Sequence, residues 1–114
     1  MYISNHRGRQ LDHGRGTIEV LPEIVRAIAR KTKIIIDGGF YRGTDVLKAI
    51  ALGAHIVGLG RLYGFGLAAF GQAGVERVLE ILEEEIHSAM ALLGVTKLSD
   101  LSEKLIHIAQ PVRP

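Results

Sequence analysis

The stretch from Lys33 to Arg61 constrains the fold of this chain more than any other stretch. Lys33 opens a strand-like run that ends at residue 36, and its β-branched residues 34–36 are typical of a parallel strand buried on both faces. A helix is predicted over 44–52, and the apolar run at 56–59 predicts a second strand. Two strands joined by a helix of this length form a parallel, right-handed βαβ unit.

Glycines follow both predicted strands directly. Asp37, Gly38 and Gly39 end the first strand, and Gly60 and Arg61 end the second. In parallel α/β architectures the carboxyl ends of the strands carry the ligand site. Glycine lets backbone N–H groups approach phosphate oxygens, and a guanidinium fork suits the same anion. These turns therefore suggest a phosphate site, although two ordinary turns and a surface cation would leave the same pattern.

The start of the chain has the features of the end of a strand. Only residues 1–3 are strand-like before a polar cluster, whereas a buried strand usually has about five or six residues. His6 lies where a loop leaves this strand end, and Arg9 follows three residues later. A histidine beside an arginine suggests a base next to a carboxylate clamp. An ordinary surface histidine is the alternative interpretation.

The helical segments have packing roles in this interpretation. Apolar residues at helical spacing predict a helix that begins at Thr17 or Glu19, with Pro22 in its first turn. The glycine-rich segment 62–71 is either a short helix over the site or a connection that covers the core. Residues 72–93 form the longest predicted helix.

A run of glutamates is expected to face water for the most part: Glu80, Glu83, Glu84 and Glu85. A last short helix is expected over 98–105, and a tail over 107–114.

Composition excludes several classes of protein. A chain of 114 residues allows one domain, which we expect to cover residues 1–114. There is no cysteine, the histidines outside the N-terminal loop have no ligand spacing, and no metal site is expected. A formal charge of +2 does not indicate a nucleic-acid partner. Neither a membrane-spanning run nor a secretory leader is expected, which favours a cytoplasmic protein.

The order of elements is strand end, helix, strand, helix, strand, helix. Three strands cannot close a barrel, because a common closed parallel barrel has eight strands and about 250 residues. The chain is therefore either a small open α/β sheet or the end of a larger barrel.

Three motifs in this order resemble one enzyme family. The motifs are Ser-Asn-His-Arg-Gly-Arg-Gln at 4–10, Asp-Gly-Gly at 37–39 with Arg-Gly-Thr-Asp at 42–45, and Gly-Arg at 60–61. They resemble the FMN-dependent 2-hydroxy-acid oxidases and dehydrogenases, among them glycolate oxidase, lactate oxidase and mandelate dehydrogenase. The resemblance runs from about Met1 to Ile106. It implies the C-terminal part of a (β/α)8 barrel, about its last two and a half βα units.

The resemblance also implies roles for single residues. His6 matches the base that takes a proton from the 2-hydroxy acid, Arg9 matches the arginine that binds the substrate carboxylate, and Ser4 matches a residue near the flavin. The ribityl and phosphate groups of FMN are expected to contact Asp37, Gly38, Gly39, Gly60 and Arg61.

The chain departs from the family pattern at two positions. Family members usually have glycine where Arg7 stands and an arginine that contacts the phosphate where Tyr41 stands. Arg42 comes one residue late and is expected to point elsewhere. Phosphate binding would then depend on Arg61 and the glycine N–H groups.

The resemblance covers only one end of the family barrel. The residues that support the flavin ring and orient the histidine lie in the other part, so we expect this chain to be inactive alone. An open sheet edge favours self-association or a companion barrel segment. Three functions remain: the catalytic end of an FMN oxidoreductase for 2-hydroxy acids, a non-catalytic flavin- or phosphate-binding module, or a self-associating half-barrel.

Overall fold

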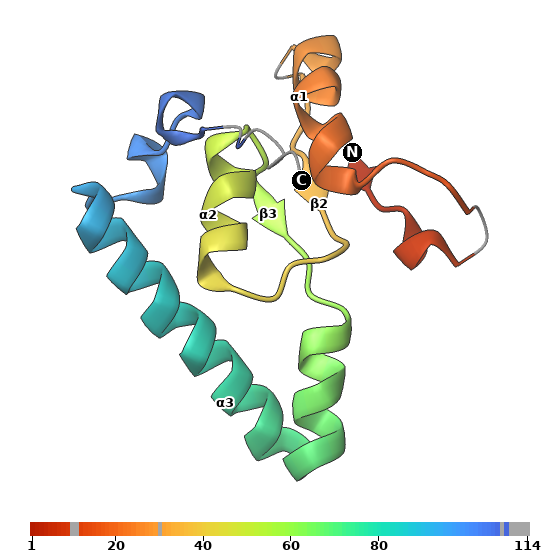
Figure 1. The fold of residues 1–114 in the computed structure, drawn as a ribbon, viewed down its shortest axis with the longest axis vertical. Helices are drawn as coiled ribbons and strands as arrows, with labels where there is room; N and C mark the ends of the chain where they lie inside the picture. Colours follow the sequence, from red (N-terminus) through yellow and green to blue (C-terminus); the bar gives the residue numbers. More distant parts are fainter. Residues whose placement is uncertain (10–11, 30, 108, 110–114) are drawn as a thin grey trace, which may run out of the picture.

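The computed structural model describes residues 1–9, 12–29, 31–107 and 109, without the side chain of Arg7. Helices and strands alternate along the chain, as Figure 1 shows. In chain order the elements are β1 (Tyr2–Ile3), the 3-10 turn η1 (His6–Gly8), α1 (Thr17–Ile28), β2 (Ile35–Ile36), α2 (Gly43–Ala51), β3 (Ile56–Val57), α3 (Arg61–Leu93), η2 (Leu98–Asp100) and η3 (Glu103–Leu105).

The three strands form one parallel sheet in the order β1-β2-β3. Tyr2 pairs with Ile35, and Ile35 pairs in turn with Ile56. No fourth strand extends the sheet within the described part of the chain. The predicted parallel βαβ unit is therefore confirmed, and the sheet is open, as in a part of a barrel.

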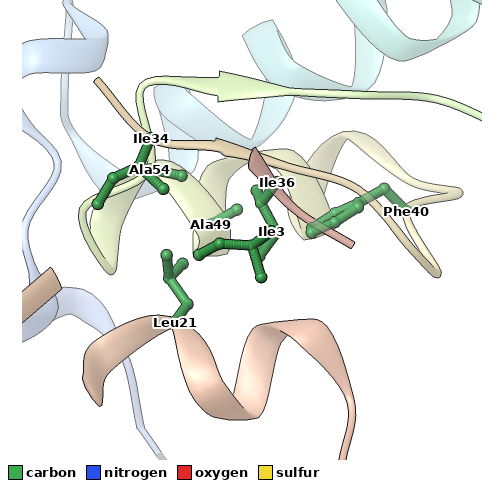
Figure 2. Packing of buried hydrophobic residues seen from close by; sticks show 7 residues of the cluster. All are labelled: Ile3, Leu21, Ile34, Ile36, Phe40, Ala49 and Ala54. Carbon is green, nitrogen blue, oxygen red and sulfur yellow. The ribbon is translucent and has the colours of Figure 1, made fainter. Parts of the chain in front are cut away.

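The main core lies between the sheet and the helices α1 and α2. Ile3 and Ile36 point from neighbouring strands toward these helices, where Leu21 of α1 and Ala49 of α2 meet them (Figure 2). Ile36 and Leu21 are completely buried. Burial of an aliphatic side chain of this size stabilises a fold by about 1.5–3 kcal/mol.

The other face of the sheet is open. Because side chains alternate along a strand, Tyr2 and Ile56 point away from the core, and their exposed fractions are 58% and 52%. Neither helix packed on the core covers this face. In a closed barrel, the inward side of a sheet is filled by side chains from the remaining strands.

Helix α1 begins at Thr17, one of the two predicted starts. The expectation that Pro22 lies in the first turn is wrong, since Pro22 lies inside the helix, in its second turn. The carbonyl of Ile18 therefore lacks the N–H donor that a helix normally supplies four residues later. The helix ends at Ile28, after which Ala29 adopts a left-handed conformation with φ 47°.

Glu85 connects α3 to the N-terminus of α2. One carboxylate oxygen accepts a hydrogen bond from the Gly43 N–H at 2.7 Å, and the other accepts from Arg42 Nε at 2.7 Å. The expectation that this glutamate faces water is wrong, because the free N–H groups and the positive end of the α2 dipole attract its carboxylate. A second core cluster lies farther along α2 and α3 and consists of Leu47, Ala51, Met90 and Leu101.

Helix α3 consists of two helical arms joined at a sharp bend, and its second arm matches the helix predicted over 72–93. It runs from Arg61 to Leu93, and the bend lies at Phe70 and Gly71, whose dihedral angles are not helical. Figure 1 shows the two arms as a V. Of the two alternatives for 62–71, the helix is therefore confirmed, although only Tyr63 of this segment lines the cleft at the carboxyl ends of the strands. Gly66 and Gly74 bring the backbones of the two arms together, and an added Cβ on either residue would overlap the other residue's backbone.

The C-terminal segment contains two single turns. The predicted helix over 98–105 is wrong, because η2 and η3 are separated by Leu101 and Ser102 in extended conformations. The buried side chain of Leu101 packs in the second core cluster instead of continuing a helix. Of the expected tail 107–114, only residues 107 and 109 are described. No described helix is long and apolar enough to span a membrane.

Candidate functional site

A cleft of about 280 Å³ lies at the carboxyl ends of the three strands. It contains seven of the eight residues that the sequence singled out, since His6 and both glycine turns meet there. Arg9 is the exception: it is exposed and does not line the cleft. The full lining is Ser4, His6, Asp37, Gly38, Gly39, Phe40, Tyr41, Gly58, Gly60, Arg61 and Tyr63.

His6 is held by the turn that follows β1. Its N–H donates to Ser4 Oγ at 3.1 Å, and the Gly8 N–H donates to the Asn5 carbonyl at 2.8 Å. His6 adopts φ 46°, a left-handed conformation that non-glycine residues use rarely and often at functional sites. Among the described residues, no carboxylate hydrogen-bonds the imidazole. The described contacts of Ser4 therefore hold the backbone of His6.

Asp37 is fixed on both sides. A carboxylate oxygen accepts from the Tyr2 hydroxyl at 2.6 Å, and the Asp37 carbonyl accepts from Thr17 Oγ1 at 2.7 Å. The hydrogen bond to Asp37 raises the pKa of Tyr2, because ionisation of the phenol would remove the donor and bring two negative charges together. These contacts anchor the first glycine turn to β1 and to the start of α1.

Tyr2 and Thr17 were missed by the sequence reasoning. The signal for Tyr2 was available, because the period of two places Tyr2 and Ser4 on one face of β1, and Tyr2 pairs with Ile35, two residues before Asp37. Thr17 was treated as a helix start alone. Its burial and its contact with the glycine turn depend on how α1 packs, which the sequence does not specify.

The glycine turns leave open space beside their backbones. Gly38 and Gly39 have φ 100° and 90°, which favour glycine. An added Cβ at Gly39 or at Gly60 would have no atom within 4 Å, so a ligand can approach both backbones closely. Gly60 also precedes the first turn of α3, where free N–H groups favour an anion. The turns therefore fit the phosphate end of a ligand such as FMN.

Arg61 is the only Lys or Arg among the described residues that line the cleft. Its guanidinium carbon lies 5.2 Å from the centre of the Tyr41 ring. Arg42 does not join it, because its side chain pairs with Glu85 on the far side of the loop. The expectation that Arg42 points elsewhere is thus confirmed. Within the described ranges, no group of three histidine or acidic residues could hold a metal ion.

Comparison with known proteins gives consistent relatives over nearly the whole chain. A family model described as FMN-dependent dehydrogenase matches residues 1–108. The chain is 46% identical over 106 residues to an L-lactate oxidase of Nostoc sp., covering 93% of this chain and 29% of that protein. It is 51% identical over 104 residues to 2-hydroxyacid oxidase 1 of Homo sapiens, covering 91% of this chain and 28% of that protein.

Solved structures agree with the sequence comparison. A flavocytochrome b2 with sulfite bound superposes with a TM-score of 0.86 at 46% identity, covering 91% of this chain and 28% of that chain. A mandelate oxidase with benzoyl-formic acid superposes with a TM-score of 0.84 at 47% identity, covering 88% of this chain and 30% of that chain. The chain thus spans less than a third of the length of these relatives.

Proposed function

This chain belongs to the FMN-dependent dehydrogenase family, and we propose that it supplies the catalytic histidine and the FMN-phosphate site for oxidation of a small 2-hydroxy acid to the 2-oxo acid. The observation that carries this proposal is the convergence of Ser4, His6 and both glycine turns on one cleft. These residues lie up to 57 positions apart (61 − 4) in the sequence.

The glycine turns and Arg61 are proposed to hold the phosphate end of FMN. The free N–H groups in the first turn of α3 and the Arg61 guanidinium supply hydrogen-bond donors for a phosphate. The open space beside Gly39 and Gly60 lets the phosphate approach the backbone. Asp37 is proposed to contact the ribityl chain, and Ser4 to lie near the flavin. FMN, when bound, accepts the two electrons that leave the 2-hydroxy acid.

His6 is proposed as the base of the reaction. Its imidazole would take the proton of the 2-hydroxyl group, and the hydrogen of the broken C–H bond would pass with its two electrons to bound FMN as the C=O bond of the product forms. Arg9 is proposed to bind the substrate carboxylate as a bidentate pair. The Arg9 side chain is exposed and does not line the cleft, so this role would require the side chain to turn toward the substrate.

A complete site needs more of the barrel than this chain provides. The open sheet face carries Tyr2 and Ile56, and among the described residues no carboxylate orients His6. A base without an orienting partner is weak. We propose that the chain alone is inactive and that a companion barrel segment, or a second copy of the chain, covers the open face.

A chimera tests this function. The C-terminal segment of the Nostoc sp. L-lactate oxidase would be replaced by residues 1–106 of this chain. We expect the chimera to bind FMN and to oxidise 2-hydroxy acids, and we expect His6→Gln to remove turnover while FMN binding remains. A chimera that binds FMN but shows equal turnover with His6 and with Gln at this position would contradict the assigned base.

The alternative function is a non-catalytic flavin- or phosphate-binding half-barrel. The His6 imidazole, which no carboxylate of the described residues hydrogen-bonds, favours it. FMN titration of the chain itself, followed by flavin fluorescence with the solution mass of the same sample, separates the alternatives. Micromolar binding by a defined species without 2-hydroxy-acid oxidation supports the binding module, and no binding by an aggregated sample restricts the function to a longer barrel.

A further inference from the structure

Arg61 and Tyr41 connect the two glycine turns. The guanidinium carbon lies 5.2 Å from the ring centre, within the range of a cation–π interaction. Tyr41 follows the turn after β2, whereas Arg61 is the first residue of α3. Both side chains line the cleft. The contact therefore joins the two segments to which the phosphate site is assigned.

The contact with Tyr41 leaves the hydrogen-bonding groups of Arg61 available. Among the described residues, Arg61 forms no ion pair, in contrast to Arg42, whose Nε lies 2.7 Å from Glu85. A guanidinium that stacks on a ring uses its face, and its five N–H donors lie around its edge. The ring can therefore restrict the guanidinium without competing for its donors.

Tyr41 is itself well supported. Its N–H donates to Asp45 Oδ2 at 3.2 Å, and its neighbour Phe40 is buried in the main core. The Tyr41 side chain is half-buried. A ring on an anchored backbone is a firmer support than a second long, flexible side chain would be.

We propose that Tyr41 is a positioning residue for Arg61 and that this pair sets the affinity of the cleft for the phosphate group of FMN. The inference rests on the proposed phosphate site. Tyr41 does not need to touch the phosphate: it limits the conformations of Arg61, so less side-chain freedom is lost when the anion binds. One arginine held by an aromatic ring then serves as the cationic group of the cleft.

The test compares FMN with riboflavin, which lacks the phosphate, in titrations of the full chain followed by flavin fluorescence. Tyr41→Leu is expected to weaken FMN binding about two- to fivefold and to leave riboflavin binding unchanged. Tyr41→Phe is the matched control, because it keeps the ring, and is expected to bind FMN like the wild type. Tyr41→Leu is expected to have no further effect in combination with Arg61→Ala.

Three results would overturn the inference: wild-type FMN affinity in Tyr41→Leu, equal weakening of riboflavin, or full additivity with Arg61→Ala. A wild-type chain that binds both flavins, and FMN no more tightly than riboflavin, would refute the proposed phosphate site and the inference together. A preference for FMN over riboflavin that is unchanged in Tyr41→Leu would refute only the inference.

The stack can also be measured in the free chain. The Arg61 side-chain N–H proton should have an NMR shift that reflects the ring current of Tyr41. We expect Tyr41→Leu to remove this contribution and Tyr41→Phe to keep it. An unchanged resonance in Tyr41→Leu would show that the ring does not hold Arg61, whatever the binding data give.

Discussion

The hydroxyl of Tyr2 donates a hydrogen bond of 2.6 Å to the carboxylate of Asp37, across the open face of the sheet. This contact ties β1 to the first glycine turn beside the cleft. The donor must be the neutral phenol, and the bond raises the pKa of Tyr2 above its ordinary value of 10.0. The bond therefore contributes stability fully below about pH 10, and the contribution is lost as the pH rises through the raised pKa.

We expect Tyr2→Phe to remove the component of the tyrosinate absorbance titration that appears above the ordinary range. Asp37→Asn is the matched control: without the carboxylate charge, the Tyr2 component should move back toward lower pH. A titration curve that keeps its shape in Tyr2→Phe would show that the phenol is not held by Asp37 in solution.

Glu85→Ala should destabilise the chain by about 1–3 kcal/mol, because it removes a charged acceptor and leaves the Gly43 N–H without a partner. Gly43 is buried, and the Glu85 side chain is only 24% exposed. Glu84→Ala is the control, since its ion pair with Arg77 is mostly exposed and should be worth less than about 1 kcal/mol. Urea unfolding of both variants measures the difference, and equal stability would contradict the contact between α3 and α2.

The bend of α3 gives a second matched pair. Gly66→Ala places a methyl group into the Gly74 backbone, whereas an added Cβ at Gly64 would meet no atom within 4 Å. We expect Gly64→Ala to stabilise the chain by up to about 1 kcal/mol, because alanine favours a helix over glycine. We expect Gly66→Ala to destabilise it by about 1–3 kcal/mol, the usual cost of overpacking. Thermal unfolding of the two variants should therefore shift in opposite directions, and shifts of the same sign would exclude close packing of the two arms.

The sequence predicted the part of the fold that depends on local pattern. The apolar run before Asp37 and the glycines after it were sufficient to predict a parallel βαβ unit. A run of β-branched residues and a glycine turn can each be recognised within a single segment. The same logic placed His6 and Arg61 at one sheet edge, whereas Ser4 was implied by the family resemblance alone, and the cleft brings all three together.

Contacts between distant segments could not be predicted in this way. Glu85 was assigned to a solvent face because its neighbours are acidic, and only the packing of α3 on α2 shows that it meets the Gly43 N–H. The bend at Gly71 was equally hidden, since its sequence is compatible with a connection or with a helix. Tyr41 was noted as a lost arginine, and its contact with Arg61 depends on the positions of two separate turns.

Thr17 gives the most local test of the first glycine turn. Its buried hydroxyl donates to the Asp37 carbonyl at 2.7 Å and lies 3.3 Å from the Gly38 carbonyl. Thr17→Val keeps the shape but leaves a carbonyl without this donor, so we expect a loss of about 1–3 kcal/mol. Thr17→Ser keeps the hydroxyl and should retain most of the stability.

The two Thr17 variants should also differ in local hydrogen exchange. If the hydroxyl holds the turn, the amides of Gly38 and Gly39 should exchange faster in Thr17→Val by more than the global loss of stability explains, because the turn opens by itself. In Thr17→Ser, their exchange should follow the global stability. Equal exchange of the Gly38 and Gly39 amides in both variants would mean that packing of α1, and not the Thr17 hydroxyl, fixes the turn. The shape of the cleft would then depend on the core formed by Leu21 and Ile36.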